Sequence, residues 1–222
     1  LFCTVLNKMI RDGVMGKMPT HLGIIFDKSE DSFRREIYPD YKAHRPPPPA
    51  ELVPQFPLMR DAVRAFGLRP VEQARYEADD LIATYCRLAC EAGADVTIIS
   101  ADKDLMQLIR PCVIMYDPAS GDQKSRGSRP ERIIGQAEVL EKFGVGPDRV
   151  VDVQALAGDS TDNVPGVPGI GVKTAAELIG IYGDLDQLLA RAGEIKQPKR
   201  RESLIQFADQ ARISRELVRL KD

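Results

Sequence analysis

The sequence lacks the patterns that define several common functional classes. No apolar run approaches the roughly 20 residues that span a bilayer, so no membrane role is predicted. There is no Walker loop and no Gly-x-Ser-x-Gly elbow, and neither His21 nor His44 has an evident catalytic companion. The chemistry of this chain is therefore not predicted to depend on a nucleophilic side chain.

Cysteine is also scarce. Cys3, Cys86, Cys90 and Cys112 form no Cys-x-x-Cys pair and lie far from both histidines in the sequence, which argues against a zinc site. No signal-peptide pattern opens the chain. We therefore expect reduced, mostly buried thiols in a cytoplasmic protein.

Charge is nearly balanced overall but unevenly distributed. The 222 residues carry a net charge of −2, which argues against wholesale electrostatic binding of nucleic acid. Basic residues nevertheless gather at 34–45 and 191–221, while acidic clusters lie elsewhere. Local charge therefore matters more here than the total.

Secondary-structure patterns change along the chain. Short β-branched runs at 22–26, 95–99 and 112–116 alternate with helical patterns near 52–66, 78–92 and 135–143. This alternation predicts an α/β fold with a mainly parallel central sheet flanked by helices. Irregular stretches interrupt it at 28–50, which ends in four prolines, and at 117–132, which is typical of a mobile loop or hairpin.

The remainder of the chain has no strand signal. Beyond residue 147 the pattern predicts only short helices separated by Gly and Pro. We therefore expect an α/β core over 1–146, with an insertion at about 28–50, and a helical lobe over 147–222.

Acidic residues cluster at the ends of predicted segments, and several follow predicted strands. In open parallel sheets, ligands bind beyond the carboxyl ends of the strands. Each cluster alone also has an ordinary explanation, because acids cap helices and favour turns. A lone Asp-x-Asp is also found in nucleotide-sugar transferases. The full set of candidate metal ligands is Asp27, Glu77, Asp79, Asp80, Asp102, Asp104, Asp159 and Asp162.

Converging carboxylates favour divalent cations, because unscreened acids raise one another's pKa values. An all-oxygen set suits Mg²⁺ or Mn²⁺ better than zinc. Two such ions, roughly 4 Å apart, can activate water and stabilise the leaving oxygen of a phosphodiester displacement. The combination therefore predicts metal-dependent phosphate chemistry.

A glycine-rich turn follows the last acidic cluster. Gly169 and Gly171 permit close backbone approach, and Lys173 and Thr174 then open a predicted helix. A phosphate oxygen fits such a helix start. A plain turn between two helices explains the same pattern.

In combination these motifs resemble the 5′-nuclease superfamily, specifically the 5′→3′ exonuclease domains of bacterial DNA polymerase I. The resemblance covers nearly the whole chain. It is carried by Phe26-Asp27, Tyr76-Glu77-Ala78-Asp79-Asp80, Ala101-Asp102-Lys103-Asp104-Leu105, Gly158-Asp159-Ser160-Thr161-Asp162-Asn163 and Gly166-Val167-Pro168-Gly169-Ile170-Gly171. It implies structure-specific cleavage of DNA in replication and repair, in the bacterial cytoplasm at the nucleoid.

The resemblance also implies roles for individual residues. Asp27, Glu77 and Asp79 would serve a first ion, and Asp79, Asp80, Asp102, Asp104, Asp159 and Asp162 a second, directly or through water. The insertion would form an arch for a 5′ flap, with Arg34, Tyr41, Lys42 and Arg45 contacting DNA and Arg34 and Lys42 acting in catalysis. The glycine-rich turn would be a helix-three-turn-helix that holds duplex DNA and often a monovalent cation, here K⁺.

Members of the family begin with a strand that carries a further metal-site Asp, and polymerase domains follow the nuclease domain. We therefore expect an upstream strand before Leu1 and polymerase domains on the same full-length chain. Two alternatives remain. The chain could bind branched DNA with an incomplete metal site, or it could be a nucleotide-sugar transferase that uses Asp102-Lys103-Asp104.

Overall fold

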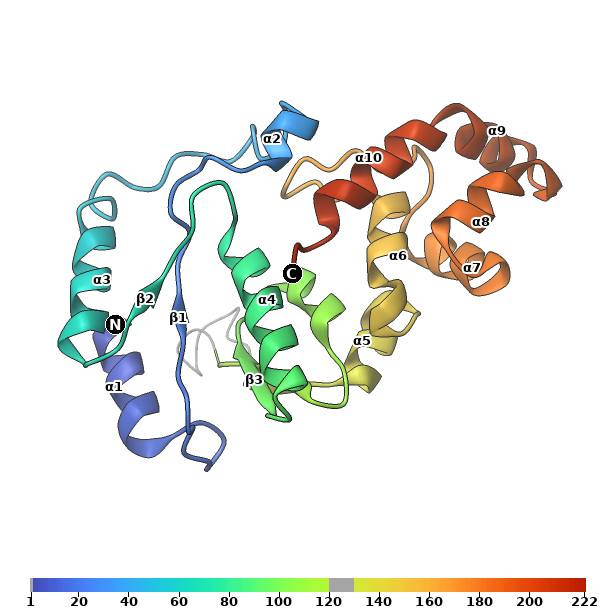
Figure 1. Cartoon of the computed structure of the whole chain (residues 1–222). Coiled ribbons are helices and arrows are strands. Elements are labelled where there is room, and N and C mark those ends of the chain that lie inside the picture. The colour runs from blue at the N-terminus through green and yellow to red at the C-terminus, as the bar shows by residue number, and fades with distance from the viewer. Residues whose placement is uncertain (1, 120–129) are drawn as a thin grey trace. The chain divides into compact units, whose positions relative to one another are not determined.

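The computed structural model describes residues 2–119 and 130–222 (Figure 1). They form two compact units. Unit 1 comprises Leu1–Ser32 and Pro46–Leu81, and unit 2 comprises Phe33–Arg45 and Ile82–Asp222. Most of the loop predicted at 117–132 lies outside the described residues. The division at 146/147 stays a prediction.

Unit 1 is built on a short parallel strand pair. β1 (Ile24–Ile25) pairs with β2 (Pro70–Val71), and α3 (Gln55–Ala65) packs against both β2 and α1 (Phe2–Asp12) (Figure 1). The predicted strand at 22–26 is present but shorter. β2 was not predicted, because its two residues are too few for an alternating pattern and one of them is a proline.

Unit 2 contains a three-stranded sheet. β3 (Val96–Ile99) runs parallel to β4 (Val113–Asp117), which pairs antiparallel with β5 (Arg132–Ile134). The predicted α/β class with mainly parallel pairing is confirmed, although the described strands form two small sheets. β5 was not predicted, since three residues are too few for a clear alternation.

Two helices accompany this sheet. α4 (Ala78–Glu91) begins in unit 1 and ends in unit 2, and α5 (Gln136–Phe143) follows β5. Both match predicted helical patterns. Val113, Met115, Ile134 and Val139 are almost completely buried between these elements, so the apolar faces of strands and helices share one core.

The remainder of unit 2 is helical, as the sequence predicted. It contains α6 (Val150–Ala157), α7 (Val172–Tyr182), α8 (Leu185–Ala190), α9 (Pro198–Gln206) and α10 (Ala208–Val218), with the short 3-10 helices η1 (Lys103–Leu108), η2 (Pro147–Arg149) and η3 (Ala192–Glu194). α6 packs against both α7 and α10 (Figure 1). Leu156 on α6 is fully buried in the same core as the sheet.

The predicted insertion divides between the two units. Its segment 33–45 belongs to unit 2 and contains α2 (Arg34–Ile37), which packs against α10. Tyr41 joins a small buried cluster with Val164, Leu217 and Val218. This part of the insertion is therefore held to the helical part of unit 2 by apolar burial.

The expectation of reduced thiols is wrong for two of the four cysteines. Cys90, near the end of α4, forms a disulfide with Cys112, just before β4. Their sequence separation of 22 concealed the pairing, whereas the fold brings their Cα atoms to 6.0 Å. Cys86 is a free, buried thiol as expected, and Cys3 is free but exposed.

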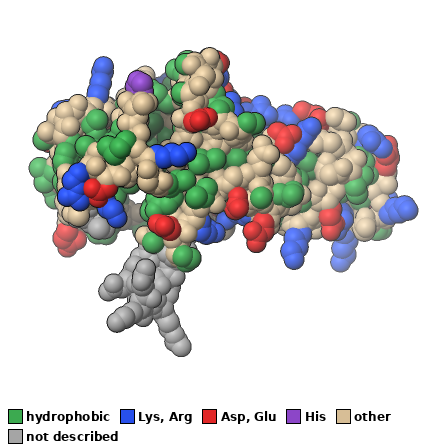
Figure 2. Space-filling model, turned by 90° about the horizontal axis from the view of Figure 1, so that it is seen from below, with side chains coloured by type: hydrophobic (Ala, Val, Ile, Leu, Met, Phe, Trp, Pro, Cys, Tyr) green, Lys and Arg blue, Asp and Glu red, His purple; other side chains and the backbone are tan. Residues whose placement is uncertain are grey.

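The surface carries both signs of charge. On the face seen in Figure 2, Lys and Arg side chains are interspersed with Asp and Glu, with apolar side chains between them. Within the described ranges, no helix is both long and apolar enough to cross a bilayer.

Candidate metal centre and nucleic-acid interface

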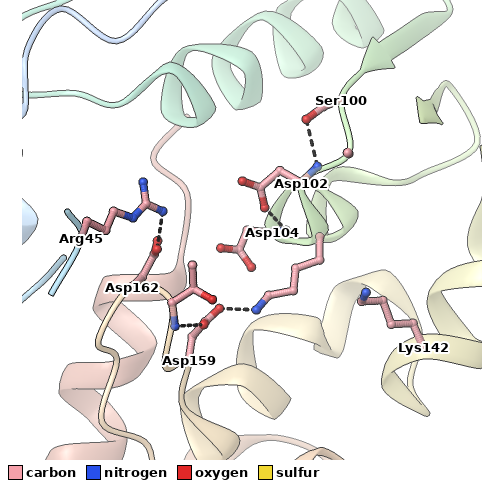
Figure 3. Close-up of a pocket in the computed structure, with 10 residues that line it drawn as sticks. Arg45, Ser100, Asp102, Asp104, Lys142, Asp159 and Asp162 are labelled. Atoms are coloured by element: carbon pink, nitrogen blue, oxygen red, sulfur yellow. Dashed lines mark hydrogen bonds and ion pairs between the residues drawn. The ribbon is translucent and has the colours of Figure 1, made fainter. Parts of the chain in front are cut away.

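Four of the predicted metal ligands line one open pocket of about 520 Å³ in unit 2 (Figure 3). Asp102 and Asp104 come from the segment after β3, and Asp159 and Asp162 come from the loop after α6. The other lining residues are Arg45, Ser100, Ala101, Lys103, Lys142 and Thr161.

Local hydrogen bonds fix the segment after β3. The Ser100 hydroxyl accepts from the Asp102 N–H at 3.0 Å, and Asp102 Oδ1 accepts from the Asp104 N–H at 3.0 Å. Asp102 is therefore the N-cap of η1. This cap also fixes the orientation of its carboxylate at the pocket.

Asp104 lies deeper and has a perturbed acidity. Burial, together with the negative charge of Asp102, raises the pKa of Asp104 to about 6. A hydrogen bond from Gln154 Nε2, at 2.5 Å, acts in the opposite direction. Gln154 is only 3% exposed, and its Oε1 has no hydrogen-bond partner among the described residues. No sequence pattern singles out this amide, because it lies within a mainly apolar helix.

The loop after α6 is closed tightly at its base. Asp159 and Val164 exchange backbone hydrogen bonds at 2.9 and 2.8 Å, while Asp159 Oδ1 accepts from the Thr161 N–H at 2.8 Å. Asp159 also accepts a hydrogen bond from Lys103. Burial would raise the pKa of Asp159, but the bonds from Lys103 and Thr161 outweigh it and lower that pKa.

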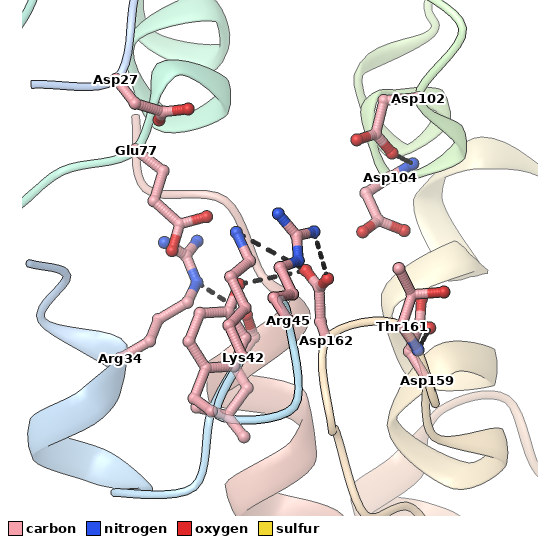
Figure 4. A network of polar contacts seen from close by, with 12 residues as sticks. Asp27, Arg34, Lys42, Arg45, Glu77, Asp102, Asp104, Asp159, Thr161 and Asp162 are labelled. Carbon is pink, nitrogen blue, oxygen red and sulfur yellow. Dashed lines mark hydrogen bonds and ion pairs between the residues drawn. The ribbon is translucent and has the colours of Figure 1, made fainter. Parts of the chain in front are cut away.

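Asp162 joins the same loop to the 41–45 segment (Figure 4). Arg45 Nη2 lies 2.5 Å from Asp162 Oδ1, and Lys42 Nζ lies 3.6 Å from Oδ2. The Tyr41 hydroxyl is 3.4 Å from Oδ2, and the Lys42 N–H donates to the Asp162 carbonyl at 2.9 Å. Three of the predicted DNA-binding residues therefore converge on one predicted metal ligand.

Arg34 and Tyr41 are both buried. Arg34 is 1% exposed and donates to the Leu217 and Arg219 carbonyls at 2.7 and 3.1 Å, because α2 packs against the end of α10. Tyr41 is 4% exposed. Neither side chain is presented to a ligand in this structure, so their contacts with DNA stay predictions.

The other four predicted ligands lie in unit 1. Asp27 follows β1, and its Oδ1 accepts from the Ala78 N–H at 2.7 Å at the start of α4. Asp80 is almost completely buried and accepts from the Glu77 N–H at 3.0 Å. Glu77 and Asp79 are partly buried. The eight acids thus form two sets of four, and a single site that unites them stays a prediction.

The glycine-rich turn exposes backbone at the start of α7. Gly169 has a φ of +80° and open space where a side chain would stand. Gly171 is the N-cap of α7, Ile170 between the two glycines is buried, and Lys173 is exposed. The buried Ile170 anchors the turn, so both the structural and the phosphate-binding interpretations fit this geometry.

The pocket suits a hydrated cation rather than one enclosed by protein ligands. Over 2–119 and 130–222, no three His, Cys, Asp or Glu side chains are grouped closely enough to enclose a metal ion. Mg²⁺ usually keeps several waters and uses only one or two carboxylates. The carboxylate oxygens fit such an ion, and so does the raised pKa of Asp104, which results from burial and from the negative charge of Asp102.

Comparisons with known proteins agree with this architecture. The T5 5′-exonuclease with bound divalent zinc ions matches with a TM-score of 0.80 and 22% identity, over 98% of this chain and 80% of that chain. A complex of the bacteriophage T5 flap endonuclease with DNA and metal ions matches with a TM-score of 0.79 and 22% identity, over 99% and 81%. The chain therefore has the 5′-nuclease fold.

Family profiles define the relationship more closely. The N-terminal resolvase-like domain of the 5′-3′ exonucleases matches residues 1–144, and their C-terminal SAM fold matches residues 145–222. The chain belongs to the 5′-3′ exonuclease family. DNA polymerase I of Rhizobium leguminosarum is 54% identical over 99% of this chain, and the chain spans only 21% of that relative.

Proposed function

We propose that this chain is a metal-dependent, structure-specific 5′ nuclease that acts on duplex DNA with a 5′ flap or a nick. The observation that carries the proposal is the convergence of Asp102, Asp104, Asp159 and Asp162 on one pocket. Membership of the 5′-3′ exonuclease family supports it. Replication and repair, at the bacterial nucleoid, are the settings we propose.

The proposed cofactors are two Mg²⁺ or Mn²⁺ ions, which would activate water and neutralise charge on the phosphodiester. In unit 2 the four pocket acids would hold one ion, directly or through water. Asp27, Glu77, Asp79 and Asp80 are the proposed ligands in unit 1.

Two basic groups beside the pocket have positions suited to a phosphate. Lys42 and Arg45 both approach Asp162, so they could exchange this acid for a phosphate oxygen when DNA binds. Arg34 and Tyr41 would support them by fixing the 33–45 segment to the end of α10.

The turn before α7 is the proposed duplex contact. Gly169 and Gly171 would offer backbone, while Lys173 and Thr174 would offer donors to phosphate oxygens. K⁺ held by carbonyls of this turn is part of the proposal, as are polymerase domains on the same full-length protein. Relatives such as DNA polymerase I of Rhizobium leguminosarum support that last point.

The test is cleavage of a 5′-labelled flap duplex during titration with Mg²⁺ or Mn²⁺. Asp102→Asn should lower cleavage by more than about a hundredfold, since even an outer-shell change at a metal site costs about 10- to 100-fold. The fold should be kept, because Asn caps a helix about as well as Asp.

Asp95→Asn is the matched control. Asp95 is exposed and precedes β3, at the opposite end of the strand that leads to Asp102. It should cleave like the unaltered chain. If Asp102→Asn also keeps the parent rate, Asp102 does not serve the metal. If the unaltered chain binds the flap duplex without metal-dependent cleavage, the alternative of an incomplete, DNA-binding fragment replaces the proposal.

A further inference from the structure

Lys142 stands apart from the other cations of the pocket. The lining contains three basic side chains, of which Arg45 pairs with Asp162 and Lys103 pairs with Asp159. Lys142 lines the same pocket, and its ammonium makes no ion pair with a carboxylate of the described residues (Figure 3). Its charge is therefore available without the loss of an existing ion pair.

The position of Lys142 is well defined by the helix that carries it. Lys142 lies in the last turn of α5, next to Phe143, which is buried in the core. Gly144 ends the helix with a φ of +73°, and the Gly135 N–H donates to Glu138 Oε2 at 2.7 Å at its start. A lysine in the last turn of a helix also complements the helix dipole. That interaction would be equally favourable on any face of the helix, so it does not explain why Lys142 lies at the pocket.

The acids of the pocket create a difficulty for a polyanionic substrate. A DNA strand that approaches four carboxylates is repelled unless cations compensate, and metal ions compensate only where they bind. In Figure 3 Arg45 and Lys142 lie on opposite sides of these acids. A strand with one phosphate at the acids would thus have a cation on each side.

We propose that Lys142 binds a phosphate of the DNA strand next to the phosphate held at the acidic pocket, on the side away from Arg45. This inference rests on the proposed function and adds a substrate contact to it. The contact is charge-assisted and independent of base sequence, since a backbone phosphate carries no base information.

Binding can be measured without cleavage, by fluorescence anisotropy of a flap duplex in Ca²⁺ over a range of salt concentrations. Lys142→Ala should weaken binding roughly fivefold to tenfold and reduce the salt slope by about one unit, as for the loss of one phosphate contact. Lys142→Arg should restore most of the affinity. Lys8→Ala, at an exposed lysine of α1, is the charge-matched control and should change neither quantity.

Single methylphosphonate linkages then identify the phosphate. Each phosphate near the cleavage site is replaced in turn by this uncharged group. At one position, the uncharged linkage should weaken binding to the unaltered chain but cause no further loss of affinity in Lys142→Ala. Unchanged affinity and salt slope in Lys142→Ala, or additive losses at every position, would overturn the contact while leaving the proposed nuclease intact. Failure of the unaltered chain to bind the duplex would overturn both proposals.

Discussion

Replacement of Gly166 by alanine should destabilise unit 2 strongly. Gly166 closes the base of the loop that carries Asp159 and Asp162, and its φ is +63°. A Cβ at this position would lie 2.7 Å from the Ala157 carbonyl carbon and closer still to the Gly158 nitrogen. These are backbone atoms, so no flexible side chain can move aside to make room.

Two costs add at this position. A left-handed backbone costs a non-glycine residue about 1–2 kcal/mol, and forced shifts in a packed region cost about 1–3 kcal/mol. The sum, about 2–5 kcal/mol, should lower the melting temperature by about 10 °C in a chain of this size. Differential scanning calorimetry on the metal-free chain measures it.

Two other glycines separate these costs. Gly169 also has a positive φ, of +80°, but nothing stands within 4 Å of a Cβ there, so Gly169→Ala should cost only the first term. Gly180 lies inside α7 with open space, so Gly180→Ala should stabilise the helix by about 0.5–1 kcal/mol. A Gly166→Ala loss no larger than that of Gly169→Ala would refute the argument from crowding.

Three further outcomes are expected. Cys90→Ser should lower the free energy of unfolding by about 3 kcal/mol, since its disulfide closes a loop with a sequence separation of 22. Denaturant unfolding under non-reducing conditions measures this loss, and the control Cys3→Ser should change the free energy little. Equal effects of the two substitutions would contradict a stabilising contribution from the disulfide. Gln154→Leu should weaken Mn²⁺ binding in calorimetry by about 10- to 100-fold, because Asp104 loses its amide donor; unchanged affinity would remove Gln154 from the site. Lys173→Ala should reduce the salt slope of duplex binding by about one unit, whatever the base sequence, and an unchanged slope would leave the turn before α7 with a structural role only.

The sequence predicted what depends on local pattern. β-branched runs located β3 and β4, and helical spacing located α4 and α5, because both signals arise from burial of one face of an element. β2 and β5 were not predicted, because two and three residues are too few to show an alternating pattern. Short strands depend on their partners, which a single sequence does not reveal.

Contacts between residues that are distant in the sequence were also not predicted. The Cys90–Cys112 disulfide and the bond from Gln154 to Asp104 join residues 22 and 50 positions apart, and Lys142 lies in the pocket with residues as distant in sequence as Arg45. Asp and Glu near a strand end are recognised in a sequence as candidate metal ligands because they are carboxylates. A glutamine in an apolar helix and a lysine on an exposed helix face are not, so only the fold identifies them.

The structure also bears on the choice between ligand and cap that the sequence left open for the acids. Asp102 caps η1, and Asp159 accepts from the Thr161 N–H in its own loop. These local roles are the ordinary explanations that made each acidic motif, taken alone, weak evidence for a metal site. A carboxylate has two oxygens and about four acceptor positions, so a bond to one backbone N–H does not exhaust it. Such a bond instead limits the rotation of the side chain, which reduces the entropy lost when a cation binds. Capping is therefore compatible with the proposed metal role and would favour it.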